Sequence, residues 1–360
     1  MELSTRLEST PPDAHAWDAL CDTVGSTPFA RPSWVNSWNA SFASRDAAFV
    51  TATRDGALVG VMPVRRRFGL LWSATNWHTP LYHPVAVDGE AEAALLQHAT
   101  HAAPGLILRF VDGSSQLAEL ASRPSGDGWS LVRRTMLESP RVDVSGSWDD
   151  YERSLSKSVV KSLRRRRRRL EELGQLDVDV VADGQEVDLR LAEGLELEHA
   201  GWKGRKGTSI MSDPHVLAFY RAFGRAAAAE GRLVLSFLRL DGRAIAFHLD
   251  LIDDGVVYGL KGTYAEDLAS LSPSRVLRHD RVRAAFEDGL RRYEFLGADE
   301  PYKGEWSNAV TRLDALELFK QSPAGRAARL VRTRGRDLAR QAIAVRHAVE
   351  RRRAPSDGNT

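Results

Sequence analysis

The chain has almost no cysteine and no long apolar run. Its single cysteine, Cys21, cannot form an internal disulfide or anchor a thiolate metal cluster. Cys21 falls in an amphipathic stretch, which predicts a small, buried, apolar side chain. No segment approaches the ~20 consecutive apolar residues that a membrane-spanning helix needs. The first residues lack the basic start and apolar core of a secretory signal, so we expect a cytoplasmic protein.

Net charge is also small, +2 over 360 residues, so the overall balance indicates no class of partner. Arginine is nevertheless concentrated in two places. Arg164 to Arg169 are consecutive, and arginines recur through the tail after Pro323. The first run predicts either a solvated helix, partly neutralised by Glu171 and Glu172, or a contact with a phosphate-rich partner such as tRNA. The basic tail predicts a helix from about 325 to 353 and a contact with a membrane surface.

Turn signals organise the chain into two similar halves. Asp55-Gly56 and Asp241-Gly242 each separate two strand-like runs, and such pairs supply the positive φ angles of a tight hairpin. A further strand follows Asp254-Gly255. In both halves an aromatic-rich helix precedes the hairpin, and more strand, a helix and a strand follow it. This order predicts an α/β (α+β) fold with an internal duplication.

The predicted boundary lies between a strand near Val142 and one helix over 148–174. We therefore expect an N-terminal domain over 1–145, a second domain over 146–322 and a basic helical tail over 323–360. The two halves differ at one helix start. Asp88, Glu90 and Glu92 complement the dipole of the first-half helix themselves and would repel an anion.

The matching start in the second half, SLSPSRVL, is uncharged apart from Arg275. Ser272 is a suitable N-cap and Pro273 fits the first helical position. Free backbone N–H groups at such a start bind phosphate well. They define a candidate donor site, with an ordinary capped helix as the alternative: Ser272, Ser274, Arg275, Val276 and Leu277.

Strand parity adds further candidates. In AIAFHLDL, His248 and Asp250 share a face with small residues, which indicates either a substrate-facing wall or a solvent-facing side. On the next strand, Lys261 and Thr263 are predicted to face the same cleft, with Gly262 between them.

Two segments are dense in functional side chains. In ADEPYKGEW, Asp299 and Glu300 follow the C-terminal end of a strand, where open α/β sheets place ligands. Asp299 is the predicted general base and His248 the second choice. Glu300, Tyr302 and Lys303 are predicted to contact substrate. In the loop 199–214, Trp202 and Lys203 are predicted to close over an acceptor.

Residues 156–181 and 259–306 together resemble the BioF2-like CelD/BcsL acetyltransferases and the related FemABX-type aminoacyl transferases. The most distinctive match is the strand followed by Gly297, Asp299, Glu300, Pro301, Tyr302, Lys303 and Trp306. HAGWKGRKG resembles the family's tryptophan-glycine loop. SPSRVL lacks both glycines of the usual phosphate loop of GNAT acetyltransferases.

The resemblance implies two tandem GNAT-like domains with mixed, mostly antiparallel sheets flanked by helices. It also implies acyl-CoA, with acetyl-CoA expected, as co-substrate, and a small-molecule or glycan acceptor with an amine or hydroxyl. Envelope polysaccharide synthesis or secondary metabolism is the implied setting. No metal is expected. The alternatives are an aminoacyl-tRNA-dependent transferase and a non-catalytic binding protein with the same fold.

Overall fold

The computed structural model describes residues 2–43, 45–123, 128–182 and 186–335, and structural statements below refer to them. The strands are β1 (Leu3–Glu8), β2 (Ala47–Arg54), β3 (Ala57–Arg67), β4 (Leu70–Ser73), β5 (Val85–Ala86), β6 (Gly105–Asp112), β7 (Trp129–Asp143), β8 (Leu176–Val181), β9 (Leu233–Leu240), β10 (Arg243–Asp253), β11 (Val256–Tyr264), β12 (Arg292–Glu294) and β13 (Ala309–Lys320). The helices are α1 (Ala14–Val24), α2 (Pro32–Phe42), α3 (Gly89–Ala102), α4 (Gln116–Ser122), α5 (Trp148–Ser154), α6 (Lys157–Glu171), α7 (Val187–Ala200), α8 (Trp202–Arg205), α9 (Pro214–Ala229), α10 (Pro273–Glu287) and α11 (Pro301–Gly304).

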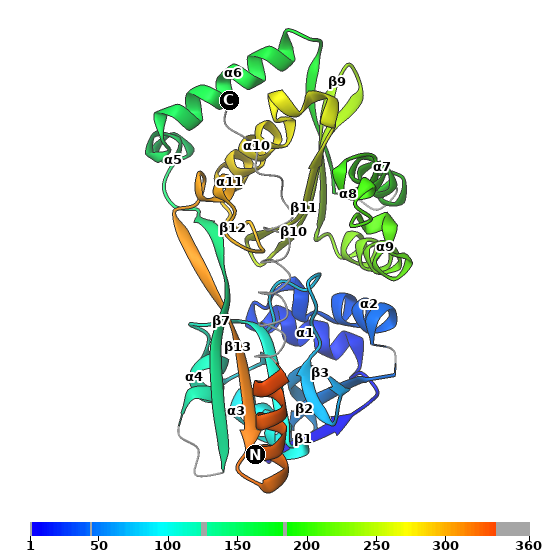
Figure 1. Cartoon of the computed structure of the whole chain (residues 1–360), viewed down its shortest axis with the longest axis vertical. Helices are drawn as coiled ribbons and strands as arrows, with labels where there is room; N and C mark the ends of the chain where they lie inside the picture. Colours follow the sequence, from blue (N-terminus) through cyan, green and yellow to red (C-terminus); the bar gives the residue numbers. More distant parts are fainter. Residues whose placement is uncertain (1, 44, 124–127, 183–185, 336–360) are drawn as a thin grey trace, which may run out of the picture.

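One mixed sheet runs through both halves of the molecule, in the order β1-β2-β3-β4-β6-β13-β7-β12-β11-β10-β9-β8, with β5 paired to β3. In the second half, α10 covers one face of the sheet and α7 and α9 cover the other (Figure 1). This arrangement confirms the predicted mixed α/β fold. In the described part of the chain, no helix is both long enough and apolar enough to cross a membrane.

The two halves repeat one element order. In the first, α2, the hairpin β2–β3, β4, α3 and β6 follow one another, and in the second, α9, the hairpin β9–β10, β11, α10 and β12 do so. Asp55 and Asp241 have φ angles of 50° and 49°, so both Asp-Gly hairpins form as predicted. Each half also contains one parallel pair, β4 with β6 and β11 with β12. The predicted duplication is therefore present in the backbone.

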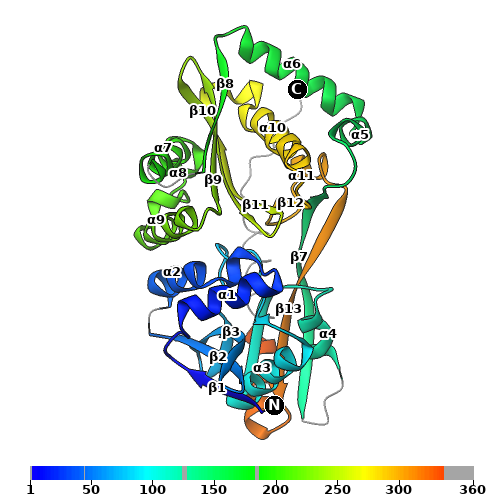
Figure 2. The same cartoon turned by 180° about the vertical axis from the view of Figure 1, so that it is seen from behind.

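Strand β13 crosses from the second half into the first. It lies between β6 and β7 and pairs antiparallel with both. Strand β7 in turn pairs with β13 along its length and with β12 near its end, so β7 and β13 form the long connection visible in Figures 1 and 2. The division at 145/146 stays a prediction. That prediction did not foresee that β13, a strand of the segment 146–322, completes the sheet of the first half.

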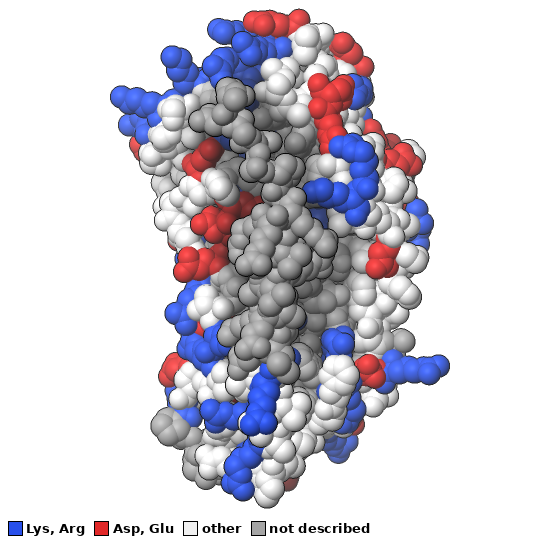
Figure 3. All heavy atoms as spheres, viewed as in Figure 1, with Lys and Arg blue, Asp and Glu red and all other residues white. Residues whose placement is uncertain are grey.

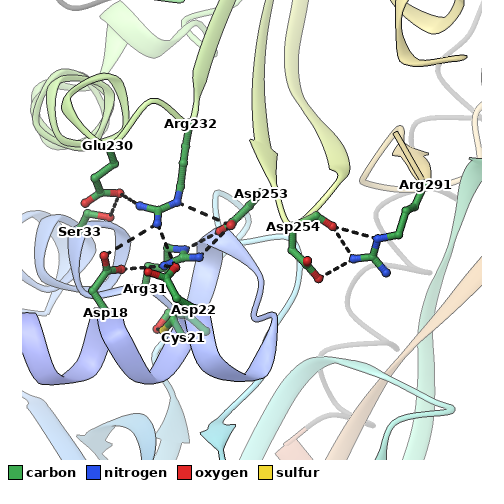
Figure 4. Close-up of polar contacts among 11 residues, drawn as sticks. Asp18, Cys21, Asp22, Arg31, Ser33, Glu230, Arg232, Asp253, Asp254 and Arg291 are labelled. Carbon is green, nitrogen blue, oxygen red and sulfur yellow. Dashed lines mark hydrogen bonds and ion pairs between the residues drawn. The ribbon is translucent and has the colours of Figure 1, made fainter. Parts of the chain in front are cut away.

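A buried ion-pair network also joins the halves (Figure 4). Arg31, only 3% exposed at the start of α2, donates to Asp253 at the end of β10 (2.5 Å) and to Asp18 of α1 (2.8 Å). Arg232 of the second half reaches the same Asp253 at 3.6 Å. Since breaking such a pair leaves an uncompensated buried charge, the network holds α1 and α2 against β9 and β10.

Aromatic packing continues the same interface. Trp34 of α2 packs edge-on against Phe219 of α9, with ring centroids 5.0 Å apart, and also contacts Phe223. Both halves therefore share one apolar core. Cys21 lies in this core with no exposure, as predicted, and burial raises the pKa of its thiol to about 12.

Three local predictions need correction. The helix expected over 148–174 is two helices, because the Ser156 hydroxyl accepts from the Val159 amide and starts α6 anew. The loop expected over 199–214 contains α8 and a short 3-10 turn. Residues 323–335 of the basic tail are helical, and the rest of the predicted tail helix lies outside the described residues.

Candidate functional site

The site begins where two parallel strands separate. Residues 256–258 of β11 pair with 292–294 of β12, after which β11 continues to Tyr264 while β12 ends. The resulting gap holds a cavity of about 600 Å³. Most of the residues predicted from sequence line it: Lys261, Gly262, Ser272, Ser274, Arg275, Trp202, Lys203, Glu300, Tyr302 and Lys303.

The start of α10 forms one side of this cavity, but not with the predicted cap. Ser272 adopts a left-handed conformation, with φ of 47°, and its hydroxyl donates to the Ala269 carbonyl instead of accepting from the helix. The Ser272 carbonyl accepts from the amides of Arg275 (3.0 Å) and Val276 (3.4 Å), so these amides are not free for phosphate. Val276 and Leu277 are buried in the core and do not line the cavity.

Ser274 and Arg278 occupy this side. They are four residues apart on α10 and both line the cavity. Arg278 is 9% exposed and its guanidinium lies 5.4 Å from the Phe295 ring. A Cβ on Gly262 would lie 3.3 Å from an Arg278 nitrogen, so the glycine provides room for the guanidinium. Sequence reasoning missed Arg278, although its i, i+4 spacing from Ser274 was available.

His248 and Asp250 lie behind this wall and not in the cavity. Both are fully buried beneath α10, because the strand face with small residues packs against that helix. The prediction that this strand face is turned toward substrate or solvent is therefore wrong. His248 Nε2 lies 2.9 Å from Ser274 Oγ. Burial, and then Arg278, holds the pKa of His248 well below its usual value, and burial raises the pKa of Asp250 to about 6.

The segment after β12 divides into an inward and an outward part. Glu300, Tyr302 and Lys303 line the cavity. Lys303 Nζ donates to the carbonyls of Leu296 (2.8 Å) and Ala298 (3.0 Å) and lies 3.2 Å from the Glu300 carboxylate, so it ties the segment together.

Asp299 is exposed and does not line the cavity, so its predicted place facing the reacting groups is wrong. The adjoining Pro301 starts α11, and this turn directs the next side chains inward instead.

The opposite side of the cavity is built by both halves. Trp77, His78 and Pro80, from the segment between β4 and β5, line the cavity together with Tyr220 of α9 and Lys261 of β11. His78 stacks on Phe42 and its Nδ1 lies 3.4 Å from the Tyr220 hydroxyl.

Burial, and then Lys261, lowers the pKa of His78 to about 4, so its imidazole is neutral at pH 7. Sequence reasoning missed this segment. TNWHTPLYH is as dense in functional side chains as the segment after β12, and that density was the available signal.

Most charged groups lining the cavity already have a partner of opposite charge. The four pairs are Glu198 with Lys203 (2.7 Å), Glu266 with Arg205 (2.6 Å), Glu300 with Lys303 (3.2 Å) and Arg275 with Glu305. Among the described residues, the side chains of Lys261 and Arg278 form no hydrogen bond or ion pair. Each side of the cavity thus presents one cation that has no direct ion-pair partner among the described residues.

The arginine run lies outside the cavity on α6. Arg164 pairs with Glu152 (2.7 Å), Arg167 with Asp280, and Arg168 with Glu172 (3.6 Å). Within the described chain Arg165, Arg166 and Arg169 have no such partner. Figure 3 shows this end of the molecule as a cluster of Lys and Arg side chains.

Residues 157–304 match the family model described as an acetyltransferase (GNAT) domain. This stretch contains α10, β11 and β12, which border the cavity, but not Trp77, His78 and Pro80 of the first half. The match and the architecture define a GNAT-type acyltransferase fold.

Three solved structures have a similar overall fold. FemX has a TM-score of 0.61 at 13% identity, over 90% of this chain and 98% of FemX. A conserved protein of unknown function from Bacteroides thetaiotaomicron VPI-5482 scores 0.59 at 11%, over 88% and 100%. The C-terminal domain (DUF2156) named for a lysylphosphatidylglycerol synthetase of Agrobacterium fabrum scores 0.54 at 15%, over 88% and 95%. No curated protein matches this chain by sequence.

Proposed function

We propose that the chain transfers an acyl group, with acetyl expected, from acyl-CoA to an amine or hydroxyl acceptor. The observation that carries this proposal is the cavity between β11 and β12, which two different walls line. The α10 wall supplies Ser274 and Arg278. The wall opposite supplies aromatic side chains, His78 and Lys261. A transferase needs two such compartments that meet, because two substrates must be held with their reacting atoms in contact.

The donor side is assigned to α10. The N-terminus of this helix carries partial positive charge, and Arg278 adds a full charge further along the same face. His248 holds the Ser274 hydroxyl from behind at 2.9 Å, so His248 is a positioning residue. Acyl-CoA supplies an activated thioester. The edge of β11 that faces the gap presents N–H groups to the oxyanion that develops during transfer.

The acceptor side is assigned to the wall of Tyr220, His78 and Lys261. A neutral imidazole that lines the cavity can take the proton that the acceptor loses. We therefore propose His78 as the general base in place of Asp299 and His248, which do not line the cavity.

Calorimetry with acetyl-CoA tests the donor assignment. Arg278→Met should weaken binding by about tenfold or more, because a charge-assisted hydrogen bond is lost. The matched control is Arg283→Met on the same helix, where Arg283 is exposed and pairs with Glu287 at 2.7 Å. Equal affinities in the two variants would contradict the assignment.

A second donor is favoured by one observation, the arginines of α6 that have no ion-pair partner among the described residues: Arg165, Arg166 and Arg169. An aminoacyl-tRNA donor would bind this surface through its phosphates, and its affinity would fall steeply with salt. Changing Arg165 and Arg166 to Gln, together with the neighbouring exposed Arg168, should then abolish tRNA binding. Acyl transfer from acetyl-CoA that is unaffected by the three changes would instead favour acyl-CoA.

A further inference from the structure

Lys261 points to the side of the sheet opposite α10. Its register partner on β10 is Leu249, which lies in the core with α7 and α9, whereas the next pair, His248 and Gly262, faces α10. Its Nζ lies 5.5 Å from the centre of the Tyr220 ring. Lys261 and Arg278 are therefore not one cation site, because they belong to different walls of the cavity.

Glu198, the carboxylate whose charge acts on Lys261, forms no direct contact with it. Glu198 is buried and uses both of its oxygens elsewhere. Oε1 accepts from Lys203 (2.7 Å) and Oε2 accepts from the Ile210 amide (2.9 Å). Burial lowers the pKa of Lys261, as expected for an ammonium removed from water with little compensation. An ammonium in this position is best stabilised by an anion that arrives with a ligand.

The surroundings of Lys261 suit a ring-containing or small polar molecule. Tyr220 and His78 form the wall beside it, and two more exposed side chains, Trp77 (72% exposed) and Trp202 (46%), lie at the rim. His78 comes from the first half and Lys261 from the second, so the position exists only in the assembled molecule. Because Lys261 and His78 both lie beside Tyr220, an anion bound at Lys261 would bring its attached nucleophile close to the His78 imidazole.

We propose that the acceptor carries a carboxylate or phosphate group and that Lys261 binds it. The inference rests on the proposed function, because the word acceptor presupposes acyl transfer. The anion site itself does not depend on that function. Lys261 is a specificity determinant on the acceptor wall. Arg278 serves the donor wall, and the two cations keep the anions of the two substrates apart.

The test uses small amines that differ only in the anion. O-phosphoethanolamine is compared with ethanolamine, and β-alanine with β-alaninamide, so that the two arms separate phosphate from carboxylate. Binding to the full chain without donor is followed by tryptophan fluorescence, because Trp77 and Trp202 line the cavity. Thiol release from acetyl-CoA is measured in parallel with the same four amines.

We expect at least one anionic amine to bind about 10- to 100-fold more tightly than its neutral partner, the range of a charge-assisted hydrogen bond. Lys261→Met keeps the length of the side chain and should remove this preference. Lys261→Arg should retain most of it. The control is Lys157→Met, at an exposed position of α6 outside the cavity, which should leave the preference unchanged.

Two outcomes overturn the inference. One is that anionic and neutral amines bind alike, or that none binds. The other is that Lys261→Met, shown folded by circular dichroism, keeps the preference. Failure of the proposed function looks different: the anions bind in a Lys261-dependent way, but acetyl-CoA does not bind and no thiol is released.

Discussion

Both halves of the sheet contain a parallel pair that separates, and in the described part of the chain the cavity of about 600 Å³ lies at the point of separation in the second half. In the first half, β4 pairs with β6 only at Leu71 and Trp72, and parallel pairing with β6 resumes only at Tyr82. Tyr82 fills the gap by bridging to Val111, and its hydroxyl donates to the Pro63 carbonyl at 2.9 Å. In the second half, β11 continues straight and nothing from its own unit fills the gap.

The starts of α3 and α10 also differ between the two halves. Asp88 caps α3, accepting from the Ala91 amide at 2.8 Å and pairing with Arg54. No side chain caps α10. The first copy of the unit has therefore used its helix start and its strand gap for its own stability, whereas the second leaves its strand gap open and places Ser274 and Arg275 of its helix start on the cavity wall. The first half instead contributes His78 to the cavity of the second.

The largest effect should come from His78, the residue that couples the halves. His78→Gln should lower kcat by ~10²–10⁴ while leaving acetyl-CoA affinity unchanged, since a general base acts in turnover. The base must be unprotonated, so wild-type activity should fall as pH drops through about 4, and the variant should lose this acidic limb.

Asp299→Asn is the control for this experiment, as an exposed residue outside the cavity. A large loss of kcat in Asp299→Asn with full activity in His78→Gln would restore the base predicted from sequence.

Removing Tyr82 from the gap between β4 and β6 should destabilise the protein without creating a donor site. Tyr82→Ala removes a 5% exposed aromatic side chain, so the free energy of unfolding should fall by about 3–5 kcal/mol. Chemical denaturation measures the loss. Calorimetry should find acetyl-CoA affinity unchanged, because α3 carries acids at its start. Additional acetyl-CoA binding in the variant would contradict the difference drawn between the halves.

Placing an acidic residue at the start of α10, as at the start of α3, should weaken binding of the acyl donor. Ser274→Asp places a carboxylate at the cavity wall where Ser274 now contacts His248. Acetyl-CoA affinity should fall by about tenfold, because the added charge repels the donor phosphates at the helix N-terminus. Ser274→Asn is the uncharged control and should bind more tightly than Ser274→Asp in the same calorimetric titration.

The smallest effect should come from the reverse change in the first half. Asp88→Ala removes the cap of α3 and should cost about 1 kcal/mol of stability. Thermal denaturation checks the value. Acetyl-CoA affinity should not change, and a weakened affinity would mean that the first-half helix contributes to donor binding.

The sequence by itself determined the local features of this protein. Asp-Gly pairs placed the hairpins, because the turn requires positive φ angles that these residues adopt at low cost. Element order predicted the repeated unit. Most of the site residues predicted from the sequence, such as Lys261 and Lys303, do line the cavity, since short segments between strand and helix ends place their side chains at one edge of a sheet.

Tertiary structure alone decided the rest. Pairing of β13 with β6 joins residues about 200 positions apart, and no local hydrogen bond or turn specifies it. The alternation of side chains along β10 placed His248 on the same face as Asp250, but it did not show that α10 would cover that face. Asp299 and Lys303 are close in sequence, yet one is exposed and the other buried. Above all, whether a charge is compensated depends on every neighbour in space, so the unpaired state of Lys261 and Arg278 became visible only once both walls of the cavity were assembled.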